Sequence, residues 1–384
     1  MKIVADINIP FIEACIGYLG EVELLNGREI TAEKVKDADA LLVRSVTQVN
    51  ESLLQGTAVQ FVATATIGFE HIDRDYLVRQ GIGFSSAPGS NANSVAEYVV
   101  AALLEIGHRK GMDLAKTSIG IVGVGNVGSR VAAKCEGLGM SVVRNDPPLA
   151  RETGDAKYLP VDAVFDCDFV TIHTPLTREG QDKTFYLANE TFYDSLKPGA
   201  VFLNTSRGAV VDTVALKSAV ASGKLGAVCL DVWENEPHID PELLGAVDLA
   251  SPHIAGYSFD GKVAGMVMIY EAMCRHFGLP VKHKVGDFLP EPEVPVLKLE
   301  ALGCIQETVR SAVQTIYAIL SDDAHTRDIL TLPEPGRGAF FDGLRKNYPR
   351  RREFQNTQIN MSVSENKVTH ILQQVGFQVT GTRV

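Results

Sequence analysis

Short apolar runs alternate with longer, helix-like segments through the first two thirds of the chain. Such runs, rich in Val and Ile and about 15 to 30 residues apart, are typical of βα units around a parallel sheet. They are KIVAD, ALLVRS, QFVATA, SIGIVGVG, SVVRND, FVTIHT, AVFLNTS, AVCLDVW and DLASPH. Because there are too many for one small sheet, the pattern predicts an α/β protein with two sheets.

One longer segment, SVAEYVVAALLEIGHR, has a different period. Ser94 and Glu97 have the spacing of a capping box, and apolar residues then recur at every third or fourth position. We expect a long helix here that bridges the two sheets.

A third region follows the proline-rich stretch KVGDFLPEPEVPVLK, whose closely spaced prolines favour an extended linker. Beyond it, apolar residues at helical spacing predict an amphipathic helix; they are Leu302, Ile305, Val309, Val313, Ile316 and Leu320. The end of the chain is predicted as helix, strand (QINMSV), helix (KVTHILQQVG) and final strand. This pattern predicts a small α+β C-terminal region.

Composition narrows the class of ligand. The 384 residues include 36 Lys and Arg against 47 Asp and Glu, a formal charge of −11, which disfavours binding to nucleic acid or to an anionic membrane. The six cysteines are scattered without a metal-binding or disulfide spacing, so we expect no metal site and a reducing compartment. The N-terminus lacks the pattern of a signal peptide, and no later run reaches the ~18 apolar residues of a membrane span. A cytoplasmic protein with a small-molecule ligand is expected.

A glycine-rich motif, Gly123-Val124-Gly125-Asn126-Val127-Gly128, joins a predicted strand to a predicted helix. In this context the first glycine permits a tight turn, the second lets backbone approach a pyrophosphate, and the third allows close helix packing. Asp146 follows at the end of the next strand, where its carboxylate would accept hydrogen bonds from the adenosine ribose and repel a 2′-phosphate. The pattern predicts NAD rather than NADP, although Arg144 nearby leaves NADP open.

Three polar residues each follow a predicted strand. Arg207 lies in NTSRG, Glu236 in DVWENEP and His253 in SPHIAG. Ligands of open α/β sheets bind at the carboxyl ends of strands, so these side chains are expected at one edge. Together they suit oxidation of a 2-hydroxy acid: the imidazole takes the hydroxyl proton, the carboxylate orients the ring, and the guanidinium holds the substrate carboxylate.

Each of the three also has an ordinary structural interpretation. A lone loop histidine is usually capped, an acid before a proline is usually solvated, and an arginine before a glycine often pairs with a helix-end acid. Glu234 is moreover a rival to Glu236. Their joint occurrence after a dinucleotide motif favours the catalytic interpretation.

The segments VTIHTPLT, LKPGAVFLNTSRGAVVD, LDVWENEP and SPHIAG, in this order, resemble the D-isomer-specific 2-hydroxyacid dehydrogenases over roughly residues 1–284. The resemblance implies two Rossmann-like, doubly wound parallel-sheet domains, one of them discontinuous, plus a small α+β C-terminal domain. Residues 1–92 and 255–284 would form the substrate domain, 93–254 the NAD-binding domain, and 285–384 a dimerisation domain. The resemblance also implies a reaction cleft between the first two domains, with hinges near residues 92 and 255.

The same resemblance assigns residues to the site. Arg207, Glu236 and His253 would be catalytic. Beyond the glycine motif (Gly123, Gly125, Gly128), the NAD contacts would be Asn126, Val127, Asp146, Thr174, Ser206, Arg207, Gly208, Asp231 and Gly256. The substrate contacts would be Ser45, Thr66 and Tyr257, with backbone N–H groups near Gly68 and Arg44 as the first candidate for a substrate phosphate.

Finer features, such as ALLVRSVTQVN and REGQDKTFYLANE, are most similar to a branch that oxidises a phosphorylated four-carbon 2-hydroxy acid as a homodimer. The basic cluster GLRKNYPRRREF is a second candidate for the phosphate if it reaches in from a partner subunit, although we favour a solvated charge run. Two alternatives stay open: the same chemistry on 3-phosphoglycerate, glycerate or lactate, and a non-catalytic NAD-sensing scaffold of the same fold.

Overall fold

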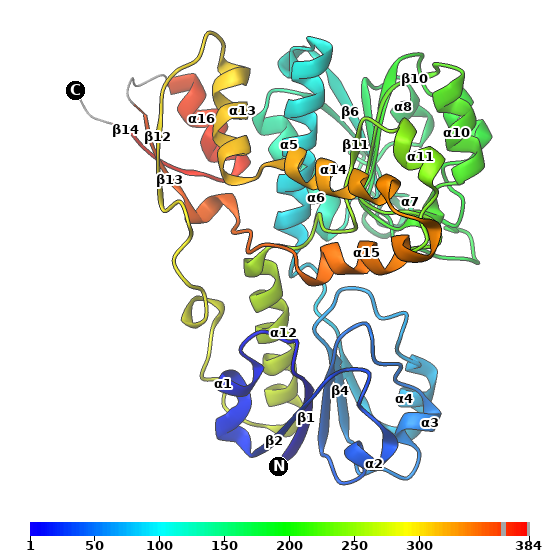
Figure 1. Cartoon of the computed structure of the whole chain (residues 1–384), viewed down its shortest axis with the longest axis vertical. Helices are drawn as coiled ribbons and strands as arrows, with labels where there is room; N and C mark the ends of the chain where they lie inside the picture. Colours follow the sequence, from blue (N-terminus) through cyan, green and yellow to red (C-terminus); the bar gives the residue numbers. More distant parts are fainter. Residues whose placement is uncertain (362–365, 382–384) are drawn as a thin grey trace. The chain divides into compact units, whose positions relative to one another are not determined.

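The computed structural model describes residues 1–361 and 366–381 of the chain (Figure 1). They form two compact units: unit 1 contains residues 1–91 and 258–290, and unit 2 contains residues 92–257 and the described residues from 291 onward. The last two residues of the predicted strand QINMSV, Ser362 and Val363, lie outside the described residues.

Unit 1 is built on a five-stranded parallel sheet of order β2-β1-β3-β4-β5. The predicted runs KIVAD, ALLVRS and QFVATA form its three central strands, which are buried on both faces. The two edge strands, β2 and β5, were not predicted. The bounds are β1 Lys2–Asp6, β2 Glu21–Leu25, β3 Ala40–Val43, β4 Phe61–Thr64 and β5 Gly83–Ser85.

Helices cover both faces of this sheet. One apolar cluster joins the sheet to α1 (Ile12–Ile16) and α12 (Phe259–Phe277), the long helix beside β1 and β4 in Figure 1. A second cluster lies on the opposite face, under α2 (Ala32–Val35), α3 (Glu51–Leu54) and α4 (Arg74–Gln80). Because α12 comes from residues 258–290, unit 1 is discontinuous in the sequence.

Unit 2 contains a six-stranded parallel sheet of order β11-β10-β9-β8-β6-β7. Neighbouring residues of its strands point to opposite faces: Val201 and Leu203 enter one apolar cluster, whereas Phe202 enters the other. This explains why the strands appear in the sequence as continuous apolar runs. The bounds are β6 Ser118–Val122, β7 Ser141–Asn145, β8 Phe169–Ile172, β9 Ala200–Asn204, β10 Leu225–Leu230 and β11 Leu249–Ala250.

The predicted long helix is α5, which runs from Ala92 to Lys110 and packs with α6 (Asn126–Gly137) on one face of this sheet. The short helices lie on connections to the strands. They are α7 (Pro147–Thr153), α8 (Asp162–Phe165), α9 (Glu190–Ser195), α10 (Thr213–Ala221) and α11 (Pro241–Ala246). The strand order reverses between β6 and β8, which is the point where open α/β sheets bind their ligands.

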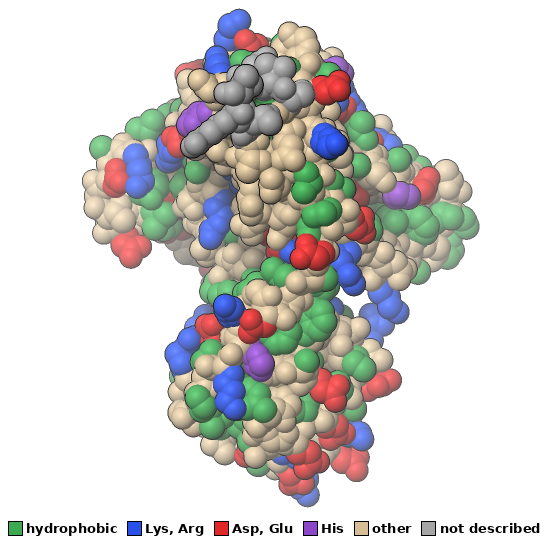
Figure 2. Space-filling view, turned by 90° about the vertical axis from the view of Figure 1, so that its left-hand side faces the viewer, with side chains coloured by type: hydrophobic (Ala, Val, Ile, Leu, Met, Phe, Trp, Pro, Cys, Tyr) green, Lys and Arg blue, Asp and Glu red, His purple; other side chains and the backbone are tan. Residues whose placement is uncertain are grey.

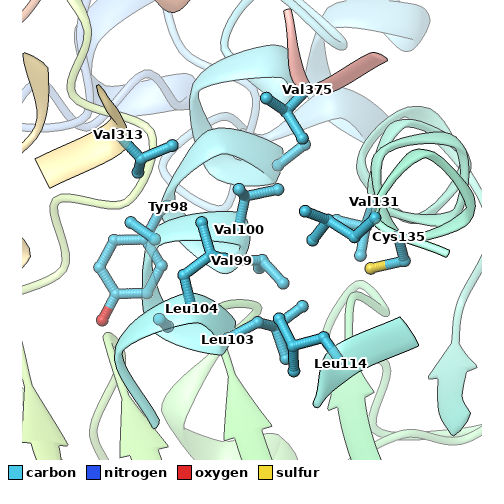
Figure 3. Close-up of a cluster of buried hydrophobic side chains, with 14 of the residues drawn as sticks. Tyr98, Val99, Val100, Leu103, Leu104, Leu114, Val131, Cys135, Val313 and Val375 are labelled. Carbon is cyan, nitrogen blue, oxygen red and sulfur yellow. The ribbon is translucent and has the colours of Figure 1, made fainter. Parts of the chain in front are cut away.

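The C-terminal region forms its own small parallel sheet but packs against α5 and α6. Figure 3 shows Val313 on one side of α5, and Val375 on the other side together with Val131 and Cys135 of α6. The sheet contains β12 (Val296–Leu299), β13 (Gln358–Met361) and β14 (Gln378–Gly381), and the helices are α13 (Ile305–Ile316), α14 (Ile319–Arg327), α15 (Glu334–Lys346) and α16 (Asn366–Val375). The linker was predicted to be extended, but its pairing as β12 was not.

The predicted fold class is confirmed: two parallel-sheet α/β units and a small C-terminal sheet. No helix among the described residues is long and apolar enough to cross a membrane. On the face drawn in Figure 2, acidic and basic side chains are interspersed rather than collected into one basic surface.

Candidate active site

The glycine motif forms the turn between β6 and α6. Gly123 has φ +88°, a left-handed conformation that favours glycine, and a Cβ on Gly128 would lie 2.0 Å from the Gly123 carbonyl oxygen. By contrast, a Cβ on Gly125 would meet no heavy atom within 4 Å. The first and third glycines therefore hold the turn together, whereas the second borders open space in front of the N–H groups at the start of α6.

Two further groups border this turn. Asp146, at the end of β7, accepts hydrogen bonds from the N–H of Val124 (2.8 Å) and the N–H of Leu149 (3.0 Å). The hydroxyl of Thr174, after β8, is buried and has no hydrogen-bond partner among the described residues. An unpaired buried hydroxyl is costly, so a bound ligand would satisfy it. Arg144 is paired with Glu136, which weakens the case for NADP.

These residues fit NAD on structural grounds. The turn has open space where a pyrophosphate would lie, and the start of α6, which no side chain caps, would face it. Asp146 lies at the strand end next to the turn. Asn126 and Val127, both predicted contacts, are the first two residues of α6.

The loop after β9 carries Arg207. Asn204, fully buried at the end of β9, accepts hydrogen bonds from the N–H and hydroxyl of Ser206 (3.0 and 2.8 Å) and donates one to the Arg207 carbonyl (3.0 Å). A Cβ on Gly208 would lie 1.8 Å from the Trp233 carbonyl oxygen, so this loop abuts the loop after β10. The contact places Arg207 next to the loop that carries Glu236.

The loops after β10 and β11 bring Glu236 and His253 into direct contact. Oε2 of Glu236 lies 2.7 Å from Nδ1 of His253, and Oε1 accepts a hydrogen bond from the Trp233 N–H at 2.8 Å. Burial opposes ionisation of Glu236, but the facing imidazole and the Trp233 N–H outweigh it and lower the pKa of Glu236. Nε2 of His253 has no hydrogen-bond partner among the described residues. The rival acid, Glu234, is used elsewhere, because it accepts hydrogen bonds from the Tyr186 hydroxyl and the Thr213 N–H.

Asp231 holds the loop that carries His253 in place. Its buried carboxylate accepts hydrogen bonds from the Ser251 hydroxyl (2.6 Å), the Ile254 N–H (2.7 Å) and the Ala255 N–H (3.0 Å). Its carbonyl accepts one from the N–H of His253, which has φ +59°, unusual for a residue other than glycine. Asp231, predicted as an NAD contact, thus positions His253, and Gly256 follows on the same loop.

His173 is a residue that sequence reasoning missed. Its ring lies between Thr171 (3.1 Å) and Thr205 (3.0 Å), so it links the ends of β8 and β9. Burial lowers the pKa of His173 to about 3, so the ring is neutral at pH 7. The run FVTIHT contains the histidine, but no sequence signal indicates that Thr205 faces it.

The remaining predicted substrate residues after β3 and β4 lie in unit 1. Arg44 donates a hydrogen bond to the Asn8 carbonyl (3.2 Å), and Ser45 is exposed. The Thr66 hydroxyl is 2.6 Å from the Thr64 hydroxyl and 2.8 Å from the Gly68 carbonyl. They follow neighbouring strands and so share one edge of that sheet.

The basic cluster after residue 344 is not the solvated run that we favoured from the sequence. Arg351 and Arg352 are buried, and the Arg351 guanidinium donates a hydrogen bond to the Ala255 carbonyl at 2.6 Å. Arg345 donates one to the hydroxyl of Tyr257 at 3.1 Å. Spacing alone did not reveal this, because the partners are about 90 residues away in the sequence.

Comparison with known proteins identifies the family of the chain. Residues 95–255 match the model of the D-isomer specific 2-hydroxyacid dehydrogenase NAD-binding domain, and residues 288–376 match a domain family of unknown function. Among solved structures, D-lactate dehydrogenase of Aquifex aeolicus, determined with NAD and lactic acid, has a TM-score of 0.58 and 24% identity, covering 72% of this chain and 96% of that one. This likeness supports the fold.

Curated relatives are similar over almost the whole chain. Erythronate-4-phosphate dehydrogenase of Hahella chejuensis is 42% identical over 380 residues, which cover 99% of this chain and 100% of that protein. The protein of the same name from Salinibacter ruber is 48% identical over 365 residues, covering 92% and 93%. The chain therefore belongs to the erythronate-4-phosphate dehydrogenase family, within the D-isomer-specific 2-hydroxyacid dehydrogenases.

Proposed function

We propose that the protein oxidises C2 of 4-phospho-D-erythronate with NAD⁺, giving 2-oxo-3-hydroxy-4-phosphobutanoate for pyridoxal 5′-phosphate biosynthesis. The observation that carries this proposal is the His253–Glu236 pair, joined at 2.7 Å with Nε2 left open, at the strand edge that also carries the glycine turn. The names of the curated relatives supply the substrate.

In the proposed reaction the C2–H and O–H bonds break and the C2=O bond forms. NAD⁺, held by the glycine turn and Asp146, would supply the acceptor for the hydride that leaves C2. His253 receives the hydroxyl proton at Nε2, while Glu236 holds Nδ1–H and stabilises the imidazolium that results. Arg207 holds the substrate carboxylate and polarises the C2 oxygen through its planar guanidinium.

Other parts of the proposal rest on the resemblance. Ser45, Thr66 and Tyr257 would contact the substrate, and Arg44 would contribute to binding its phosphate. Residues 285–384 would mediate homodimerisation, which light scattering tests directly. A cytoplasmic location suits the six cysteines, none of which forms a disulfide.

A comparison of substrates tests the reaction. NADH formation is measured with 4-phospho-D-erythronate, 3-phosphoglycerate, glycerate and lactate at equal concentrations. We expect the highest kcat/KM for 4-phospho-D-erythronate. A preference for another acid would assign the same chemistry to that substrate, and NADH binding without turnover of any of them would favour the NAD-sensing scaffold.

A further inference from the structure

We propose that Arg345 binds the substrate phosphate, so that the C-terminal region supplies a specificity residue to the active site of its own chain. This inference rests on the proposed function. It also gives a role to a region whose family match, residues 288–376, carries no known function.

Helix α15 is docked beside the catalytic loops. Gly338, Phe341 and Arg345 recur at helical spacing and lie along one side of the helix. Phe341 is fully buried in the apolar cluster that contains Trp233, and a Cβ on Gly338 would lie 2.7 Å from the ring of His238, two residues after Glu236. The helix therefore packs on the loop after β10 and directs its C-terminal end, where Arg345 lies, along that loop.

At this end, Arg345 reaches the segment that follows the catalytic histidine. Its Nη2 donates a hydrogen bond to the hydroxyl of Tyr257 (3.1 Å), and the guanidinium carbon is 5.8 Å from the centre of that ring. Tyr257 is four residues after His253 and is itself a predicted substrate contact. The charge of Arg345 also contributes to the lowered pKa of Glu236, which agrees with its place near both loops.

Part of the Arg345 guanidinium is left for a ligand. Its Nε is buried and has no hydrogen-bond partner among the described residues. The nearest carboxylate that pairs with it, Asp342, is 3.9 Å from Nη1, which is too far for a hydrogen bond. The side chain is 28% exposed, so it is shielded from solvent without being closed off. An unpaired N–H on a cation whose side chain is still partly exposed favours an anion as its partner.

The phosphate suits this position better than the carboxylate does. The carboxylate is attached to C2, whose hydroxyl faces His253, and Arg207 already lies on the neighbouring loop to hold it. The phosphate is two carbons farther from C2, and a guanidinium fork matches its oxygens. Arg44, the other candidate, is directed to the Asn8 carbonyl and has no buried unpaired N–H.

The C-terminal region is tied to the same loop at a second point. The guanidinium of Arg351 lies 4.3 Å from the centre of the Tyr317 ring and donates a hydrogen bond to the Ala255 carbonyl at 2.6 Å. Arg351 is therefore a positioning residue, which keeps the His253–Tyr257 segment fixed while Arg345 meets the ligand.

The test compares Arg345→Met with Lys346→Met, which removes the same charge from the next, exposed residue. The measured quantity is the ratio of kcat/KM for 4-phospho-D-erythronate to that for D-erythronate, because a general defect of the site cancels in this ratio. We expect Arg345→Met to lower the ratio by about 10- to 100-fold, as for lost hydrogen bonds to a charged group. Lys346→Met should leave it unchanged, and Arg345→Lys should recover part of it.

Inhibition by inorganic phosphate gives a second measurement that does not need turnover of D-erythronate. Its Ki should rise in Arg345→Met and not in Lys346→Met, while NADH titration shows that both variants retain the cofactor site. Equal loss for both substrates with an unchanged Ki would overturn the inference. If the parent protein does not prefer the phosphorylated acid, the proposed function fails instead.

Discussion

At the scale of residues, the hydrogen bond between His253 and Glu236 determines which ring nitrogen can exchange a proton with the substrate. With Glu236 on Nδ1, the tautomer of His253 is fixed and Nε2 is the only ring nitrogen left to exchange a proton with substrate. Removing a general base typically costs about 10²- to 10⁴-fold in rate. We expect His253→Ala to lower kcat by that amount, as measured by NADH formation at saturating substrate.

The affinity for NADH is the control for this variant. Because His253 is held by its own backbone N–H on the Asp231 carbonyl, the loop should keep its shape without the ring. NADH titration should give a Kd close to that of the parent protein. Undiminished turnover would remove His253 from the mechanism.

The neutral His173 makes stability depend on pH. Its pKa is about 3 in the folded protein and about 6.5 in the unfolded chain, so the unfolded state binds more protons between these values. The contribution of His173 to the free energy of unfolding is therefore complete above pH 6.5. It is lost as the pH falls toward 3, by at most about 1.4 kcal/mol per pH unit. The ring keeps partial exposure, so we expect a smaller slope.

Urea unfolding of His173→Gln and of the parent protein at about pH 7 and about pH 5 measures this effect. The parent protein should lose more free energy of unfolding than the variant over this interval. Equal losses would mean that His173 can be protonated in the folded state.

The sequence predicted Arg207, Glu236 and His253 because each lies directly after an apolar strand, and the position of a strand end is local information. It could not choose between Glu236 and Glu234 on that basis. The choice depends on Tyr186, which engages Glu234 from a distant loop. His173 was missed, and Arg345 was named only within a basic cluster that we favoured as a solvated charge run. In both cases the partners lie far away in the sequence, and only the fold brings them near.

At the scale of elements, the turn from β6 to α6 contains one glycine that packing requires, Gly128, and one that borders open space, Gly125. We expect Gly128→Ala to lower the melting temperature, because its Cβ would be driven to 2.0 Å from the Gly123 carbonyl oxygen. Gly125→Ala meets no protein atom within 4 Å, so it should weaken NADH binding by blocking the pyrophosphate while leaving stability nearly unchanged.

Thermal unfolding and NADH titration are measured for both variants, and each variant is the control for the other. A Gly125→Ala protein that binds NADH as tightly as the parent would place the pyrophosphate elsewhere. A Gly128→Ala protein of full stability would contradict the close contact between the turn and the helix.

The strands that sequence reasoning missed share a physical cause. The edge strand β2 has partly exposed side chains, β5 has only three residues, and β12 lies in a stretch dominated by prolines. None of them forms the continuous apolar run that identifies a strand buried on both faces. Central strands can be predicted from their apolar composition, whereas edge strands depend on the neighbouring strand that they pair with.

At the scale of the whole molecule, the C-terminal region is integrated with the NAD-binding sheet within unit 2. The amphipathic pattern of residues 302–320 indicated burial but not against what. The structure gives the answer: α13 and α16 share one apolar cluster with α5 and α6. The helix that begins at the glycine turn is thus supported by residues more than 200 positions later in the chain.

This shared cluster predicts that damage to the C-terminal region destabilises the cofactor domain. Leu372 of α16 is fully buried in it, and replacing a buried leucine by alanine costs about 2–5 kcal/mol. We expect Leu372→Ala to lower the free energy of unfolding of unit 2 by that amount, with the C-terminal region and the NAD-binding sheet unfolding together. Leu302→Ala, at a leucine that is 46% exposed, is the matched control and should cost less than about 0.5 kcal/mol.

Urea unfolding of both variants, followed by circular dichroism and by loss of bound NADH, distinguishes the outcomes. If Leu372→Ala produced a separate early transition with NADH binding intact, the C-terminal region would be an independent module rather than part of the cofactor domain.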